Sequence, residues 1–169
     1  MKTIVSIIAA MDEKRGIGKD NKIPWHIKED LIHLKNLTKD QIVILGRKTY
    51  ESMVGYYQKS GRPMPGHLYI VVTHDKNYKT GNGQVLIVNS LEDAIANAGS
   101  GEAFIIGGGQ IFKEAMEKSL VNKLYLTIVK GDFDCDTFFP EYSEFDKIIS
   151  EQERSEGKYK FKIVALATA

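Results

Sequence analysis

The stretch that decides the fold is Ala103-Phe104-Ile105-Ile106-Gly107-Gly108-Gly109-Gln110-Ile111-Phe112. It opens with a continuous apolar run, which is typical of a strand covered on both faces. Three glycines follow, and a helical pattern over Gln110–Lys118 begins directly after them. A buried strand that turns tightly into a helix indicates parallel strands joined by helical crossovers.

The same alternation of strand and helix covers most of the chain. Further strands are predicted from apolar runs at Thr3–Ala10, Gln41–Leu45, Leu68–Thr73 and Val85–Val88. Further helices are predicted at Ile27–Leu37, Lys48–Val54 and Leu91–Ala98, the last with Ser90 as its N-cap. The chain then becomes strand-like at Lys123–Lys130, Lys147–Arg154 and Tyr159–Ala167, with a turn at 155–158 that joins the last two into an antiparallel hairpin. We therefore expect an α/β fold: one domain over 1–169, with a mostly parallel sheet of seven or eight strands, an antiparallel C-terminal edge and four helices.

Composition narrows the classes of function. The chain has 169 residues, which is the usual size of one domain. Its net charge is +1, so it has no excess of basic residues to bind nucleic acid or an anionic membrane. The single cysteine, Cys135, cannot form an internal disulfide, which fits the reducing cytoplasm, and the four histidines show no zinc-ligand spacing. The apolar start of the chain is β-branched and is followed at once by charged residues, so we expect a buried first strand rather than a signal peptide.

Two strand-to-helix junctions have the chemistry of anion sites. Glycines at 107–109 would let a ligand approach the backbone, and the following helix N-terminus would offer free N–H groups to a phosphate. At the second junction, Gly46 precedes Arg47, Lys48 and Thr49. Cations are unfavourable at a helix N-terminus unless they face a shared anion. The alternatives are a tight turn at the first junction and a solvated basic pair at the second.

An acidic residue lies on the apolar side of the helix predicted at 27–37. At 100° per residue, Leu31 and Leu34 fall close to the direction of Ile27, and Asp30 falls on the same side of the helix. A buried carboxylate needs a cationic or hydrogen-bonding partner, which favours a ligand at Asp30. The alternative is that Asp30 only complements the helix dipole. Upstream, residues 15–25 form a glycine-containing loop that ends at Pro24 and the only tryptophan, Trp25, and such a loop is a candidate lid.

The sequence resembles bacterial dihydrofolate reductases over nearly its whole length. The resemblance rests on the order and spacing of these motifs: Ala9-Ala10, Gly16-Ile17-Gly18, Asn21, Pro24-Trp25, Asp30-Leu31, Gly46-Arg47-Lys48-Thr49, Glu51-Ser52, Arg62-Pro63-Met64-Pro65-Gly66, Ile106-Gly107-Gly108-Gly109, Leu126-Thr127 and Asp136-Thr137-Phe138-Phe139-Pro140. It implies a mixed sheet of eight strands flanked by four helices, and reduction of 7,8-dihydrofolate to tetrahydrofolate by NADPH in a cytoplasmic monomer.

The resemblance also implies roles for individual residues. Asp30, tied to the ring by Thr127, would orient and polarise the pterin while hydride reaches C6 and a proton reaches N5 through water, and Trp25 would position that water. The substrate site would comprise Ile8, Leu31, Leu34, Lys35, Met53, Arg62, Met64, His67 and Ile106. Residues implied to bind NADPH are Ala10, Ile17, Gly18, Gly46, Arg47, Lys48, Thr49, Thr73, Gly107, Gly108, Gly109, Gln110, Ile111 and Phe112. Of these, Arg47 with Lys48 and Thr73 would bind the 2′-phosphate, and the family has a cis peptide between the first two glycines of the triplet.

Three departures concern mainly the substrate. His67 stands where the family normally has an arginine for the glutamate tail, Phe112 replaces a commoner tyrosine, and Val54–Gly61 lengthens the loop before Arg62. Two alternatives remain open. One is a reductase of the same fold that acts on the pyrimidine intermediate of riboflavin synthesis, and the other is a non-catalytic NADPH-binding protein.

Overall fold

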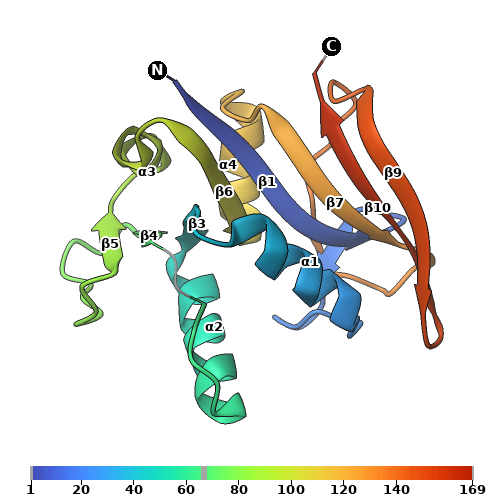
Figure 1. Ribbon diagram of the computed structural model, residues 1–169, viewed down its shortest axis with the longest axis horizontal. Coiled ribbons are helices and arrows are strands. Elements are labelled where there is room, and N and C mark those ends of the chain that lie inside the picture. The colour runs from blue at the N-terminus through green and yellow to red at the C-terminus, as the bar shows by residue number, and fades with distance from the viewer. Residues whose placement is uncertain (1, 66–67, 169) are drawn as a thin grey trace.

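The sheet of this protein has its first strand near the centre (Figure 1). The structure is a computed structural model that describes residues 2–65 and 68–168. Over these residues eight strands form one sheet in the order β5-β4-β3-β6-β1-β7-β10-β9. Their bounds are β1 Thr3–Asp12, β3 Ile42–Gly46, β4 Leu68–Val72, β5 Val85–Val88, β6 Gly101–Gly107, β7 Lys123–Val129, β9 Lys147–Glu156 and β10 Tyr159–Ala167.

Strand direction follows the predicted pattern. β1 pairs in parallel with both β6 and β7, and the β5-β4-β3-β6 side is parallel throughout. β10 is antiparallel to β7 and to β9, so the C-terminal hairpin forms the antiparallel edge. The carboxyl ends of β3 and β6 are neighbours, since Leu45 pairs with Gly107, and this brings both glycine junctions to one edge of the sheet.

The helices cover the two faces of the sheet. They are α1 Lys28–Thr38, α2 Arg47–Ser60, α3 Leu91–Ala98 and α4 Gly109–Glu117. Side chains alternate across each strand. Accordingly Ile44 packs in the cluster that includes Leu91 of α3 and Phe112 of α4, whereas its neighbour Leu45 packs with Tyr50 of α2. α1 crosses the same side as α2, in front of β1 in Figure 1.

The predicted loop Val54–Gly61 is wrong, because α2 continues to Ser60. A glycine inside a helix costs only about 1 kcal/mol relative to alanine, so Gly55 does not end it. Val54 instead packs against the cluster around Leu45. The helix stops at Gly61, which has a φ of 69° and donates its N–H to the Gln58 carbonyl. As Figure 1 shows, α2 extends well away from the sheet.

The candidate lid contains a short strand that the sequence analysis missed. β2 (Gly16–Gly18) pairs antiparallel with β8 (Thr137–Phe138) in a separate two-stranded sheet. Asp136 reinforces this pairing: its N–H donates to the Gly18 carbonyl (2.9 Å), and its Oδ2 accepts from the Asp20 N–H (3.0 Å). Two segments 116 residues apart in sequence therefore meet beside the site.

Across the described residues, no helix is both long enough and apolar enough to span a membrane.

Candidate functional site

Asp30 and Thr127 form a hydrogen-bonded pair between α1 and β7. The Thr127 hydroxyl, buried at 2 % exposure, donates to Asp30 Oδ1 at 2.7 Å. Burial raises the pKa of the Asp30 carboxyl, while the Thr127 hydrogen bond and the nearby His33 ring act in the opposite direction. Thr127 has one hydroxyl to donate, so the carboxylate retains acceptor capacity for a second donor.

The C-terminal hairpin holds the start of α1. Glu156 lies at the end of β9, and its two carboxylate oxygens accept hydrogen bonds from the N–H groups of Lys28 (2.7 Å) and Glu29 (3.0 Å). Arg154 on the same strand pairs with Glu29 at 3.3 Å. An acidic group at a helix N-terminus satisfies free N–H groups and complements the helix dipole. The hairpin thus fixes the first turn of α1, which carries Asp30.

Trp25 is buried beside this helix. It is 6 % exposed and packs with Ile27 and Val129, while the ring of Phe133 meets it edge-on at 5.2 Å between centroids. The indole N–H at Nε1 is buried and has no hydrogen-bond partner within residues 2–65 and 68–168. Because buried donors normally have a partner, this N–H is suited to a ligand or an ordered water.

Backbone and side chains approach closely at the glycine junction of β6 and α4. A Cβ atom at Gly108 would lie 3.2 Å from Thr49 Oγ1, and one at Gly109 would lie 3.1 Å from Thr137 Cγ2. Gly107 has a φ of 141°, a conformation that residues with side chains rarely adopt, and the Gly107–Gly108 peptide is cis, as the resemblance implies. Gly46 lies opposite, where a Cβ would be 3.8 Å from the Gly108 nitrogen. The backbone at both junctions therefore lies close to neighbouring side chains, with little space for a Cβ at Gly108 or Gly109.

The helix N-termini at this edge lack side-chain caps. The Ser90 hydroxyl caps α3 by accepting from the Asp93 N–H at 3.0 Å, and Glu156 caps α1. In the described part of the chain, no side chain caps α2 or α4, which begin after Gly46 and Gly108. Free N–H groups at two adjacent helix starts form an anion-binding surface that fits the pyrophosphate of a dinucleotide.

Arg47 lies at this surface with two partners that sequence analysis missed. Its Nη1 pairs with Glu51 at 3.0 Å, and its guanidinium carbon lies 5.8 Å from the centre of the Tyr78 ring. Thr73 follows β4, whose Val72 pairs with Gly46, so Thr73 lies at the same edge of the sheet. Lys48 is exposed next to Arg47. Arg47 and Lys48 thus place two positive charges at this edge of the sheet, a charge pattern that suits a phosphate.

The apolar residues expected around the substrate fall into separate groups. Met53, Met64 and Ile106 pack against one cluster centred on Val43 and Leu45. Ile8 is buried in β1, Leu34 is half-buried, and Leu31 is 42 % exposed, so the apolar side of α1 is only partly covered by protein. Lys35 and Arg62 are exposed, and His67 lies outside the described residues.

The remaining expected cofactor contacts surround the glycines. Ile17 Cδ1 would lie 3.6 Å from a Cβ at Gly109, and the buried Phe112 ring would lie 3.8 Å from a Cβ at Gly107. Ile111 reaches Gly46, Ala10 packs beside the Trp25 cluster, and Gln110 is exposed. Gly18 is half-buried in β2. No group of three or more His, Cys, Asp or Glu side chains in the described ranges could hold a metal ion.

Comparison with known proteins identifies the family. The family model described as dihydrofolate reductase matches residues 4–168. The chain belongs to the dihydrofolate reductase family. It is 37% identical to dihydrofolate reductase of Staphylococcus aureus over 139 residues, covering 82% of this chain and 79% of that protein. It is 39% identical to dihydrofolate reductase type 3 of Salmonella typhimurium over 140 residues, covering 82% and 80%.

A solved dihydrofolate reductase has the same fold. The Enterococcus faecalis enzyme, complexed with NADP(H) and RAB-propyl, superposes with a TM-score of 0.81 and 30% identity, covering 98% of this chain and 96% of that one. The expected resemblance to bacterial dihydrofolate reductases, and the fold that it implied, are confirmed.

Within this member of the dihydrofolate reductase family, sequence reasoning missed several residues near the candidate site. His33 lies three positions after Asp30 on α1, and its ring favours the ionised form of that carboxyl. Its buried Nε2 has no partner among the described residues. The i, i+3 spacing from Asp30 was a usable signal for His33. No local pattern pointed to Glu156, which is 126 positions downstream of Asp30 in the sequence.

Proposed function

We propose that the chain reduces 7,8-dihydrofolate to 5,6,7,8-tetrahydrofolate with NADPH. The observation that carries the proposal is the Asp30 carboxylate, held by the Thr127 hydroxyl at 2.7 Å and otherwise able to accept hydrogen bonds. Family membership, with relatives named dihydrofolate reductase, supports it. The pterin ring of dihydrofolate presents an amino group beside a ring nitrogen, a donor pair that a carboxylate binds with charge-assisted hydrogen bonds.

Asp30 orients and polarises the pterin in this proposal. Hydrogen bonding from the substrate stabilises the carboxylate, which offsets the burial that raises its pKa. Protonation at N5 proceeds through water, and the free Nε1–H of Trp25 is the donor that positions this water. The burial of Trp25 helps to exclude bulk solvent from the reacting atoms.

NADPH, when bound, supplies the hydride that reaches C6 of the pterin. The uncapped N-termini of α2 and α4, with Gly46 and Gly107–Gly109, bind its pyrophosphate. Arg47, Lys48 and Thr73 bind the 2′-phosphate, and Thr49 lines the glycine surface. The nicotinamide-side residues are Ala10, Ile17, Gly18 and Phe112, with Gln110 and Ile111 at the start of α4.

The folate body occupies a site formed by residues of β1, α1, α2, β6 and the segment after α2. Its walls are Ile8, Leu31, Leu34, Met53, Met64 and Ile106. Leu31 supports this assignment. Its apolar side chain is 42 % exposed, and burying it against a ligand would be favourable in free energy. His67, Lys35 and Arg62 hold the glutamate tail. We also propose a cytoplasmic monomer, in keeping with the single cysteine.

A steady-state comparison of substrates tests the function. Loss of NADPH absorbance is followed with purified protein after addition of dihydrofolate, the riboflavin-pathway pyrimidine, or neither. We expect consumption only with dihydrofolate, and faster consumption with NADPH than with NADH. Turnover of the pyrimidine alone would replace the proposed substrate, and binding of NADPH without any turnover would indicate a non-catalytic protein.

A further inference from the structure

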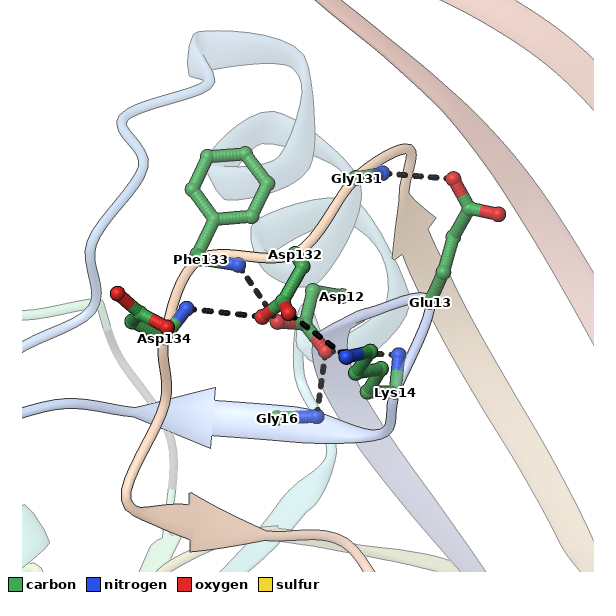
Figure 2. Close-up of polar contacts among 8 residues, drawn as sticks. All are labelled: Asp12, Glu13, Lys14, Gly16, Gly131, Asp132, Phe133 and Asp134. Atoms are coloured by element: carbon green, nitrogen blue, oxygen red, sulfur yellow. Dashed lines mark hydrogen bonds and ion pairs between the residues drawn. The ribbon is translucent and has the colours of Figure 1, made fainter.

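A buried carboxylate that the proposed reaction does not use lies at the end of β1. Asp12 is 1 % exposed. Its Oδ1 accepts hydrogen bonds from the N–H groups of Lys14 (2.9 Å) and Gly16 (2.7 Å), and its Oδ2 accepts from the Phe133 N–H (3.0 Å), as Figure 2 shows. Three backbone donors compensate the cost of burying this charge.

The two segments that Asp12 joins both reach the candidate site. Gly16 begins β2, which carries Ile17 and Gly18 to the glycine junction at Gly109. Phe133 packs its ring against Trp25 at 5.2 Å. One carboxylate therefore fixes β2 through its Oδ1 and the aromatic partner of Trp25 through its Oδ2.

Two further side-chain contacts between these segments, next to Asp12, are exposed. Glu13 accepts from the Gly131 N–H at 2.6 Å, and Lys14 pairs with Asp132 at 2.8 Å (Figure 2). Exposed ion pairs contribute little to stability, so they cannot replace the buried bonds of Asp12. The packing beneath is tight, because a Cβ at position 16 would lie 2.4 Å from the Cys135 Cβ.

We propose that Asp12 is a positioning residue for the reduction, acting through β2 and through the Phe133–Trp25 contact. This inference rests on the proposed function. It requires a carboxylate at position 12, because the three donors occupy both oxygens. An amide has one acceptor oxygen and one NH₂ group. In either orientation the NH₂ group of asparagine would face a backbone N–H group and could not accept its hydrogen bond. The variant would therefore lose either the bond from Phe133 or the bonds from Lys14 and Gly16.

The test compares Asp12→Asn with Glu13→Gln, an isosteric change at the exposed neighbour, whose side chain still offers an oxygen to the Gly131 N–H. We expect Asp12→Asn to lower kcat for dihydrofolate by on the order of 10- to 100-fold through misplacement of the reacting groups, with a smaller change in KM. The isotope effect with NADPH deuterated at C4 should rise. In the ligand-free protein, the emission of Trp25, the only tryptophan, should shift to longer wavelength. Glu13→Gln should match the wild type in all four measurements.

Several outcomes would overturn the assignment. A folded Asp12→Asn protein with wild-type kcat removes the role, and so does a loss of kcat without any change in Trp25 emission. If Asp12→Asn does not fold, Phe133→Leu keeps the backbone bond to Asp12 but removes the ring from Trp25, and unchanged emission and kcat in that variant would contradict the proposal. A wild-type protein that does not reduce dihydrofolate refutes the proposed function itself, whereas an active wild type with an unaffected Asp12→Asn refutes only the role of Asp12.

Discussion

The ionised form of the Asp30 carboxyl is less favourable in the folded protein than in the unfolded chain. Burial raises its pKa above the ordinary value of 3.8, so the unfolded chain loses the proton first as pH rises. The free energy of unfolding therefore falls as pH rises from about 3.8 through the folded pKa. A buried ionisable group that lowers the free energy of unfolding is typical of a functional site.

Replacing Asp30 should reveal this cost. Asp30→Asn removes the ionisation while keeping an oxygen for Thr127, so we expect the variant to be more stable than the wild type at neutral pH. The difference should shrink as pH falls to 3.8 and below, where the wild-type carboxyl is protonated. Chemical denaturation of both proteins at several pH values measures this. A variant that is less stable at neutral pH would show that the carboxylate is well compensated in the free protein.

Arg47 should distinguish the two nicotinamide cofactors. Arg47→Ala removes the guanidinium beside Glu51 and Tyr78, and we expect Kd for NADPH to rise far more than Kd for NADH, since only NADPH carries the 2′-phosphate. Titration of each cofactor by fluorescence checks it. Lys59→Ala, at the far end of the same helix, is the matched control for loss of one positive charge. Equal losses for both cofactors would place Arg47 away from that phosphate.

Position 67 should affect only substrates with a glutamate tail. Histidine is mostly neutral at pH 7 and offers one well-aimed donor, whereas arginine holds a carboxylate through two charged hydrogen bonds. We expect His67→Arg to lower KM for dihydrofolate by the equivalent of about 1–2 kcal/mol, with little effect on a pterin lacking the tail. Steady-state kinetics with both substrates measures this. Equal improvement for both, or none, would mean that residue 67 does not meet the tail carboxylate.

At the scale of elements, the C-terminal hairpin and α1 depend on each other through Glu156. The N–H groups of Lys28 and then Glu29 hold the pKa of the Glu156 carboxyl below its ordinary value of 4.5. This contribution to stability is present above the unfolded pKa and is lost as pH falls through the folded one.

Glu156→Gln should weaken that connection in a pH-dependent manner. We expect the variant to be less stable than the wild type at neutral pH and nearly equal to it in acid, where the wild-type carboxyl is protonated. Turnover should also fall, since the first turn of α1 carries Asp30. Denaturation curves across pH report the stability, with Glu153→Gln on the same strand as the control. A stability deficit that persists unchanged in acid would assign the effect to packing rather than charge.

For the whole molecule, local pattern predicted the sheet, the two glycine junctions and the unusual position of Asp30, and the family resemblance implied the other site residues. Long-range contacts account for what was missed. Five continuous apolar runs and three further strand-like segments located the eight strands of the sheet. The structure brings the two glycine junctions to one edge, because the carboxyl ends of parallel strands meet there. The predicted end of α2 was too early, because a glycine such as Gly55 is typical of a helix end. The helix continues to Ser60 because Val54 packs against the core and Gly61 forms the C-cap. The pairing of β2 with β8, the three bonds of Asp12 and the cap by Glu156 join distant segments and have no local signal.

The Asp30–Thr127 pair is proposed to bind the pterin of dihydrofolate during its reduction. The most direct test is formation of tetrahydrofolate from dihydrofolate and NADPH, measured for the wild type and Asp30→Asn together with the Kd of each for NADPH. We expect product from the wild type, turnover reduced by about 10²–10⁴-fold in the variant, and nearly equal Kd values for NADPH. Wild-type turnover in Asp30→Asn at neutral pH would contradict it.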